Sequence, residues 1–528
     1  MNLSPVLING KWREARNPVT AFYGVNPKSG KRIESYYPVS CFDEIKEALH
    51  AAKDAVLKLA STPPEKRAHF LELHARKIEE RKEELTTTAA LETGLPEEPR
   101  LASVELPRTT DQLRQAAAAV RKRDWCQATI DTSRNIRSKY DPLGGAVIIL
   151  GPNNFPLAFN SVTGGDFAAA IAAGNPVLAK ANPGHPGTSK ILAEAAFEAV
   201  EESGLPYSSI QMFYHCTEKD GYRIITHPFT AAISFTGSGA AGLKLKEAAE
   251  SCGKLIYLEM SSVNPLFILP GALKERKEEI ASDFFNSCTL GTGQFCTKPG
   301  LVVLAESKEA EEFISAVSRL LSSQEPGFLL GEGVLKEIRE KVKLFKFNGA
   351  EVITGGSSFN LKQGFRFKNT LLLISGSQFL TNPLDFQEEI FGPVSLFVLA
   401  ESTNQMTKIA HILRGNLTAS IFSAHDGSDE QLYRELEPVL RFKAGRLLND
   451  KMPTGVAVSP AMTHGGPFPA TGHPGFTSVG IPFSFLRFAA RHCYDNVRQD
   501  RLPPELKDKN PTGLMWRYID GEWTQRSL

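Results

Sequence analysis

Cys296 stands in a loop whose composition suits a reactive thiol. It follows a glycine-rich run at residues 289–293 and precedes Thr297 and Lys298. A nucleophilic cysteine needs exposure and hydrogen-bond donors that favour its thiolate, and a glycine-rich loop with free backbone amides can supply both. Many loop cysteines are instead small packing residues. The residues around Cys296 leave both interpretations open.

A second candidate site is the glycine pattern at residues 235–242. Gly237, Gly239 and Gly242 match GxGxxG between a strand-like and a helix-like segment. In that context the pattern predicts backbone amides and a helix N-terminus facing a pyrophosphate. Tight strand–helix packing by small residues is the structural alternative. If the site binds a dinucleotide, Glu259 at the end of the next strand is a candidate ligand for the ribose hydroxyls.

The elements that must position these residues alternate between strands and helices. Short apolar runs bounded by Gly and Pro predict buried strands, and 3.6-residue periodicity predicts helices. This alternation indicates βαβ units in a doubly wound nucleotide-binding domain, followed after residue 265 by a second α/β domain. The predicted strands are 145–150, 176–179, 210–214, 231–235, 255–258 and 301–304, and the predicted helices are 165–173, 188–202 and 273–287.

Other segments lie outside these units. Helical periodicity covers residues 43–92 and 97–122, and the polar segment 124–140 resembles a protruding hairpin. Residues 8–12 (INGKW) echo residues 519–523 (IDGEW). Asn-Gly and Asp-Gly between apolar residues are type I′ hairpin signals, and we interpret the two as unrelated edge hairpins.

The composition is that of an ordinary globular chain of two or three domains. The 528 residues carry 60 Lys+Arg against 59 Asp+Glu, a formal net charge of +1. This balance offers no electrostatic case for nucleic acid or a membrane surface as a partner. The 7 cysteines include no CxxC pair, which argues against a disulfide framework and against a metal site such as zinc. With no signal-peptide pattern and no long apolar run, we expect a cytoplasmic protein.

Four segments together resemble the aldehyde dehydrogenase superfamily. They are residues 151–156 (GPNNFP), 258–265 (LEMSSVNP), 293–297 (GQFCT) and 388–393 (EEIFGP), in the family's order. The motif MTHGGPFPATG at 462–472 makes the chain look closest to α-ketoglutaric semialdehyde (2,5-dioxovalerate) dehydrogenases, and NADP-linked fatty aldehyde dehydrogenases are similar.

The resemblance implies the α/β aldehyde dehydrogenase fold. A Rossmann-like cofactor-binding domain is expected at residues 1–124 and 142–265, and an α/β catalytic domain at 266–470. Small β oligomerisation and C-terminal elements are expected at 125–141 and 471–528. The same resemblance implies a homodimer or a homotetramer.

The resemblance also implies NAD(P)-dependent oxidation of an aldehyde to a carboxylic acid. Cys296 falls on the nucleophile, which forms a thiohemiacetal and then a thioester. Asn154 falls on the amide that stabilises the oxyanion together with the Cys296 backbone N–H. Glu259 falls on the base that activates the hydrolytic water, a role that overrides its assignment to the ribose.

Residues that contact the cofactor in the family are present as well. They match the lysine and the glutamate–phenylalanine pair near the two riboses, and the glycine turn near the phosphates. These residues are Lys180, Glu389, Phe391, Gly237, Ser238 and Gly242.

Three positions depart from the family pattern or need comment. Many NAD-specific members carry a ribose-binding glutamate where this chain has Pro183, so Lys180 and His185 are free to attract a 2′-phosphate. We therefore expect NADP to be accepted beside NAD. Lys298, two residues from the thiol, would either lower the pKa of the thiol or point to solvent, and we expect the second. His464 is expected near the aldehyde entrance without a role in proton transfer.

The predicted substrate is α-ketoglutaric semialdehyde, whose far carboxylate needs a cation or amide donors. Arg108 and Gln112 lie one helical turn apart and are the candidates, although Arg108 would serve a surface ion pair equally well. Pocket walls are expected from Phe155, Phe159 and Phe468, which would also suit a medium- or long-chain fatty aldehyde.

Three other functions use the same fold. A catalytically silent scaffold is disfavoured by the intact Cys296, Glu259, Asn154 and Lys180. A thiol hydrolase that needs no cofactor would use the same Cys and Glu, so only cofactor dependence separates it. A CoA-acylating reductase is disfavoured by the presence of a hydrolytic base at Glu259.

Overall fold

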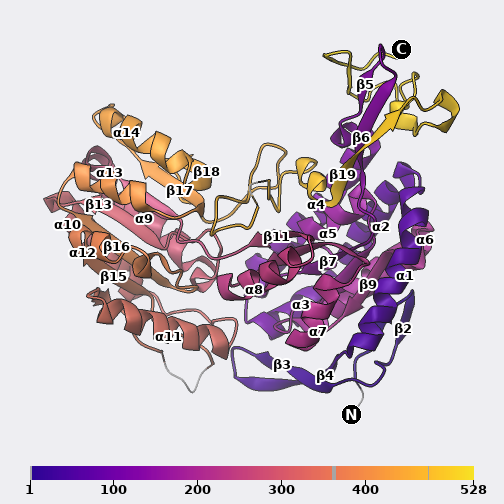
Figure 1. Cartoon of the computed structure of the whole chain (residues 1–528). Coiled ribbons are helices and arrows are strands. Elements are labelled where there is room, and N and C mark those ends of the chain that lie inside the picture. The colour runs from indigo at the N-terminus through magenta and orange to yellow at the C-terminus, as the bar shows by residue number, and fades with distance from the viewer. Residues whose placement is uncertain (1–2, 360–363, 474) are drawn as a thin grey trace.

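Three β-sheets and a two-stranded ribbon organise the chain (Figure 1). The computed structural model describes residues 3–359, 364–473 and 475–528. The first sheet has the strand order β11-β10-β7-β8-β9-β1-β2. Its strands are β1 (Val6–Ile8), β2 (Lys11–Arg13), β7 (Ala146–Leu150), β8 (Val177–Lys180), β9 (Ile210–Phe213), β10 (Thr230–Thr236) and β11 (Leu255–Glu259).

The parallel strands of this sheet bring their carboxyl ends to one edge. Leu150 pairs with Lys180 and with Phe235, and Thr236 pairs with Glu259. The predicted strands of this region are confirmed within one or two residues, because each apolar run is buried on both faces of the sheet. The crossover helices are α5 (Gly165–Ala173), α6 (Pro186–Ser203), α7 (Glu218–Thr226) and α8 (Gly239–Glu250).

The N-terminal helical region is more broken than its periodicity predicts. Residues 43–92 form three helices, α1 (Phe42–Ala60), α2 (Pro64–Glu80) and α3 (Lys82–Thr93). Pro63 cannot continue α1, and Gly94 ends α3 in the left-handed region at φ 70°. Across the described ranges, no helix combines the length and the apolar composition that a bilayer span requires.

The second sheet and its helices lie on the opposite side of the molecule from the first sheet in Figure 1. Its order is β14-β15-β16-β13-β12-β17-β18, with β14 alone antiparallel to its neighbour. The strands are β12 (Pro265–Ile268), β13 (Leu301–Ala305), β14 (Glu351–Thr354), β15 (Thr370–Ser375), β16 (Val394–Ala400), β17 (Asn416–Phe422) and β18 (Ala444–Asn449), covered by helices that include α9 (Pro270–Thr289), α10 (Lys308–Ser323), α11 (Glu332–Phe347), α13 (Thr403–Ile412) and α14 (Glu430–Arg441).

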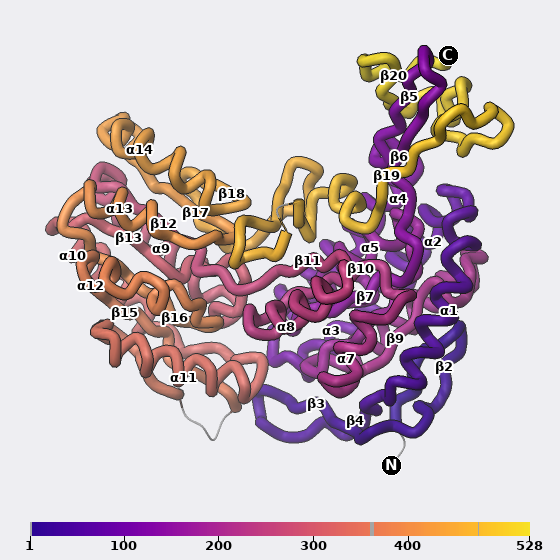
Figure 2. The backbone as a smooth tube through the Cα atoms, in the orientation of Figure 1, coloured from indigo at the N-terminus to yellow at the C-terminus, as the bar shows by residue number. Residues whose placement is uncertain are grey.

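The third sheet joins segments that are far apart in the sequence. In Figure 2 the chain leaves β18, crosses to the first sheet and ends beside the hairpin of residues 129–142, which is drawn in purple. The sheet contains β5 (Thr129–Asp131), β6 (Ile136–Pro142), β19 (Ala489–Asp495), β20 (Arg517–Ile519) and β21 (Glu522–Thr524).

Both predicted edge hairpins are confirmed. Asn9 and Gly10 have φ of 50° and 69°, and Asp520 and Gly521 have φ of 49° and 94°. Positive φ at both central residues defines the type I′ turn that joins β1 to β2 and β20 to β21. The two hairpins lie in different sheets, so their similar sequences reflect the same turn chemistry in two places.

Candidate active site

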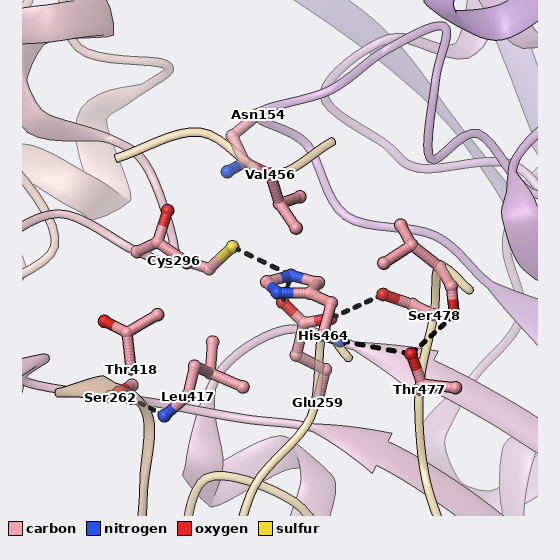
Figure 3. Close-up of polar contacts among 12 residues, drawn as sticks. Asn154, Glu259, Ser262, Cys296, Leu417, Thr418, Val456, His464, Thr477 and Ser478 are labelled. Carbon is pink, nitrogen blue, oxygen red and sulfur yellow. Dashed lines mark hydrogen bonds and ion pairs between the residues drawn. The ribbon is translucent and has the colours of Figure 1, made fainter. Parts of the chain in front are cut away.

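The three predicted catalytic residues meet between the first two sheets, together with a fourth residue (Figure 3). Cys296 Sγ lies 3.4 Å from His464 Nε2. The same nitrogen lies 2.9 Å from Glu259 Oε1. The Asn154 amide donates to the backbone carbonyl of Gln294 at 3.0 Å, two residues before the thiol.

A left-handed turn presents Cys296. Gly291, Thr292 and Gly293 have φ of 56°, 58° and 68°. A Cβ on Gly293 would lie 2.3 Å from the carbonyl oxygen of Gly392, so this close approach requires glycine. Beyond the turn, the Asn264 amide donates to the Cys296 carbonyl at 2.8 Å and to the Lys298 carbonyl at 2.9 Å. The backbone that carries the thiol is therefore fixed by the glycine turn before it and by the Asn264 side chain.

Glu259 ends β11 and its side chain is only 2% exposed. Burial opposes its charge, but the contacts with His464, the Cys296 thiol and the Ser478 hydroxyl outweigh burial and keep the pKa of the carboxyl below its usual value. The Ser478 hydroxyl donates to Glu259 Oε2 at 3.3 Å. Glu259 is thus held as a carboxylate, the form that a general base requires.

The Cys296 thiol is affected in the opposite direction. Burial, the charge of Glu259 and a hydrogen bond from the thiol to that carboxylate raise the pKa of Cys296 well above its usual value. The resting thiol is therefore protonated. Formation of the nucleophile needs a group that takes the proton, and the Glu259 carboxylate already accepts a hydrogen bond from the thiol.

The placement of His464 corrects the expectation from the sequence. Its side chain is 2% exposed and contacts both the nucleophile and the carboxylate, so it lies closer to the reacting atoms than the sequence predicted. Its backbone N–H donates to the Thr477 hydroxyl at 3.1 Å, and Ser478 N–H donates to its carbonyl at 3.1 Å. The histidine stood in a motif recognised in the sequence, but its distance to the thiol depends on tertiary structure.

A buried ion pair supports the loop that carries Asn154. Arg100 pairs with Glu105 and also donates to the Asn154 carbonyl at 3.0 Å. Glu105 Oε1 accepts the backbone N–H groups of Leu157 and Ala158 at 2.8 and 2.9 Å. Neither Arg100 nor Glu105 was singled out from the sequence, because nothing in their local pattern marks them.

An apolar cluster adjoins the thiol. Phe155 and Phe159 lie in it as predicted, 5.2 Å apart between ring centroids. Phe295, the residue before the cysteine, is a third ring that the sequence interpretation overlooked. Phe468 does not belong to the cluster, and its side chain is 56% exposed, so its expected role as a pocket wall is not supported.

Arg108 lies against this cluster from α4 (Leu106–Lys122). Its guanidinium lies 5.2 Å from the Phe159 ring centroid, and Nη1 donates to the Val456 carbonyl at 2.7 Å. Its Nε and Nη2 atoms are buried and have no hydrogen-bond partner among the described residues. Burial lowers the pKa of Arg108, and the negative charges of Glu105 and Glu259 oppose that shift.

Gln112 is used differently from the prediction. Its amide group donates to the carbonyls of Ala158 and Thr163 at 2.8 and 3.3 Å. Both amide hydrogens are committed to the backbone, so none remains for a substrate carboxylate. Gln112 supports the loop of Phe155 and Phe159 instead.

Lys298 is also corrected. Its side chain is 2% exposed, and the ammonium donates to the carbonyls of Ile390 (3.0 Å) and Val394. It therefore does not point to solvent. Burial raises the pKa of Glu389 to about 7, and the positive charge of Lys298 opposes that rise. Phe391 packs against a small cluster next to this segment.

The glycine turn lies between β10 and α8. The Gly237 N–H donates to the Glu259 carbonyl at 3.0 Å, and the Ser238 hydroxyl caps α8 by accepting the Ala241 N–H at 3.4 Å. A Cβ on Gly242 would lie 2.8 Å from Met260 Sδ. Gly242 therefore serves strand–helix packing, whereas the first turn of α8 is partly exposed.

Lys180 ends β8 at the same sheet edge. Burial lowers the pKa of its ammonium, which makes one long hydrogen bond, 3.4 Å, to the Ala181 carbonyl. Pro183 is exposed. His185 was predicted to attract the 2′-phosphate of NADP. It is instead buried, with Nε2 2.9 Å from the Pro152 carbonyl, and is not available for that contact.

Comparison with known proteins decides the family. The sequence profile described as "Aldehyde dehydrogenase family" matches residues 12–458. The chain belongs to this family. The aldehyde dehydrogenase fold and the family assigned from the four motifs are thereby confirmed.

Relatives in the aldehyde dehydrogenase family cover almost the whole chain. Alpha-ketoglutaric semialdehyde dehydrogenase 2 of Azospirillum brasilense is 36% identical over 509 residues, or 94% of this chain and 95% of its own. The alpha-ketoglutaric semialdehyde dehydrogenase of Acinetobacter baylyi is 37% identical, with 98% of each chain covered. The NAD⁺ complex of aldehyde dehydrogenase from Bacillus cereus has a TM-score of 0.80 at 22% identity, over 93% of this chain and 96% of that one, and shares the fold.

The contact between Glu259 and the thiol predicts a measurable change in reactivity. Glu259→Gln removes a negative charge that raises the pKa of Cys296. We expect alkylation of Cys296 by iodoacetamide to become roughly tenfold faster at neutral pH, because a charge at this range is worth more than about 1.4 kcal/mol. Mass spectrometry of the Cys296 peptide over time measures the rate.

The matched control is Glu388→Gln, because the Glu388 side chain is 50% exposed. It should leave the alkylation rate unchanged. An equal or slower rate in Glu259→Gln would show that this carboxylate does not hold the thiol protonated.

Proposed function

We propose that the chain oxidises α-ketoglutaric semialdehyde to 2-oxoglutarate with NAD(P), through a thiohemiacetal and a thioester on Cys296. The observation that carries this proposal is the convergence of Cys296, Asn154 and Glu259 beside a buried guanidinium with unpaired donors. The names of the two relatives that cover this chain support the same substrate.

Activation of the nucleophile is assigned to Glu259. Its carboxylate takes the proton of Cys296, while His464 Nε2–H donates to Glu259 Oε1 at 2.9 Å and holds the carboxylate in place. The proton passes from Glu259 to solvent before the hydrolytic step. The thiolate then attacks the aldehyde carbon. The Asn154 amide, together with the backbone N–H of Cys296, receives the oxyanion of the tetrahedral thiohemiacetal, and the Arg100–Glu105 pair keeps the Asn154 loop in place.

Hydrolysis is assigned to Glu259. A bound nicotinamide dinucleotide supplies the hydride acceptor that turns the thiohemiacetal into a thioester. Glu259 then takes a proton from the water that attacks the thioester carbonyl, and Cys296 leaves as the thiolate. The low pKa of the carboxyl suits this role because the base is ionised before the water arrives.

The substrate carboxylate is assigned to Arg108. A buried donor without a partner costs about 1–3 kcal/mol, and more when it is charged, so a ligand that accepts from Nε and Nη2 gains this energy on binding. The aromatic rings of Phe155 and Phe159 flank the same guanidinium and would contact the carbon chain of the substrate.

The residues at the sheet edge fit a dinucleotide. The ammonium of Lys180 has spare hydrogens for ribose oxygens, the first turn of α8 after Ser238 offers backbone N–H groups to phosphate, and Glu389 offers a carboxylate to the second ribose. With Pro183 in place of a ribose-binding carboxylate, nothing at that position repels a 2′-phosphate. We propose that NADP is accepted as well as NAD.

The third sheet is proposed as the assembly element of a homodimer or homotetramer. Its outer hairpin carries Trp523 and Tyr518, which are both exposed and lie 5.5 Å apart between ring centroids. Exposed aromatic residues of this kind are typical of interface cores.

Reduced cofactor formation tests the proposed reaction. NADH and NADPH are measured by absorbance with α-ketoglutaric semialdehyde and with a series of medium- and long-chain aldehydes. We expect the semialdehyde to be favoured in kcat/KM by tenfold or more, which is about 1.4 kcal/mol. Higher kcat/KM for long aldehydes would make the acid-semialdehyde assignment wrong, and activity retained in Cys296→Ala would make the whole proposal wrong.

Arg108→Leu tests the carboxylate contact. We expect kcat/KM for the semialdehyde to fall about 10- to 100-fold, because hydrogen bonds to charged groups are worth about 1.5–3 kcal/mol. The value for a neutral aldehyde of similar length should change little. An equal loss for both aldehydes would assign Arg108 to loop structure and not to the substrate.

Lys298→Met tests the cofactor contact of Glu389. Without the lysine charge, the pKa of Glu389 rises further, so the carboxylate is lost at neutral pH. We expect NADH affinity, measured by fluorescence titration, to fall about tenfold at neutral pH and to recover in alkaline solution. Lys343→Met, at an exposed position of α11, is the control. Affinity that falls equally at every pH would contradict the charge argument.

A further inference from the structure

Three side chains of different chemistry direct ligand atoms at one point of the active site (Figure 3). Cys296 Sγ, a carboxylate oxygen of Glu259 and a ring nitrogen of His464 all lie within 4.8 Å of one another. We propose that this cluster is a Zn²⁺ site, and that the zinc-bound form is a reversibly inhibited state of the enzyme. This inference rests on the geometry and does not depend on which aldehyde is the substrate.

The separations are close to those of a tetrahedral zinc site. Zn–S bonds of about 2.3 Å and Zn–N or Zn–O bonds of about 2.0–2.1 Å place ligand atoms about 3.3–3.6 Å apart. Sγ and Nε2 are already 3.4 Å apart, and Nε2 and Glu259 Oε1 are 2.9 Å apart. The second distance has to open by about 0.4 Å to reach this range.

The ligand types select the metal. A thiolate and an imidazole favour Zn²⁺ over Mg²⁺ or Ca²⁺, which prefer oxygen ligands. The thiolate and the carboxylate together balance the charge of the ion. Three protein ligands leave a fourth position for water, and the Ser478 hydroxyl already orients Glu259 through its other oxygen.

The absence of a CxxC pair does not bear on this site. Its ligands come from the end of β11, the turn after α9 and the segment after β18. No local spacing of residues in the sequence could therefore predict the site. Among the described residues, this is where three such ligand atoms come together.

Binding and inhibition follow from one exchange. Zn²⁺ replaces the proton on Cys296 sulfur, the proton passes to solvent, and a Zn–S bond forms with no change in oxidation state. The metal occupies the sulfur lone pair that attacks the aldehyde and the Glu259 carboxylate that would accept the thiol proton. A chelator that removes the ion restores both groups.

Metal binding is measured without aldehyde or nucleotide, so its failure is separate from failure of the proposed reaction. Full-length protein is stripped with a chelator and titrated with Zn²⁺ by calorimetry, and with Co²⁺ by absorption. We expect one Zn²⁺ per chain and a sulfur-to-cobalt charge-transfer band. Zn²⁺ should protect Cys296, but not the exposed Cys252 and Cys493, from iodoacetamide, as mass spectrometry would show.

Variants separate this site from adventitious binding. His464→Phe and Glu259→Gln should each weaken Zn²⁺ binding at least about tenfold, because loss of a ligand costs no less than loss of an outer-shell partner. Cys252→Ser and Cys493→Ser should leave binding unchanged. The proposal is wrong if the exposed cysteines account for the bound zinc, or if Cys296 of the native protein stays reactive when zinc is bound.

Discussion

The contact between the Glu259 carboxylate and the His464 imidazole is the interaction on which the site depends. Both side chains are almost completely buried, and an unpaired buried carboxylate would be costly. The partner of this carboxylate, His464, lies in the chain after β18, which returns to the first sheet. It does so along β11, where Met260 N–H donates to the Ala470 carbonyl at 2.8 Å and Gly472 N–H donates to the Leu258 carbonyl at 3.3 Å. The same return places Ser478 on the carboxylate.

Backbone geometry holds the opposing wall. The turn before Cys296 can approach the segment at Gly392 only because Gly293 lacks a side chain. Behind it, Asn416 accepts the backbone N–H groups of Val263 and Asn264 at 3.0 and 3.1 Å, and Asn264 in turn holds the Cys296 carbonyl. The cysteine is thus connected through two asparagines to β17 of the second sheet. The site is positioned by loops, but each loop is tied to a sheet.

The electrostatics of the site affect the resting thiol and the reacting thiol differently. Glu259 stabilises the protonated thiol, and a protonated thiol is a poor target for oxidants. The same carboxylate accepts the hydrogen bond of the thiol, and in the proposed reaction it takes the proton from the sulfur. One buried carboxylate therefore opposes the bare thiolate at rest and supplies the base that forms it in the reaction.

Local patterns in the sequence determined the five parallel strands of the first sheet, β13 of the second sheet, the two I′ hairpins, and the motifs that contain Cys296, Glu259 and Asn154. These features depend on periodicity, turn chemistry and residue order, all of which act over a few residues. Tertiary structure alone decided which side chains surround these predicted catalytic residues. Lys298 is two residues from the thiol yet buried against the segment 390–394, and His464 meets Cys296 from 168 positions away. Gln112 lost its predicted role because buried backbone carbonyls needed its amide. Which side chain satisfies which buried group is set by contacts between distant segments, and no local pattern records them.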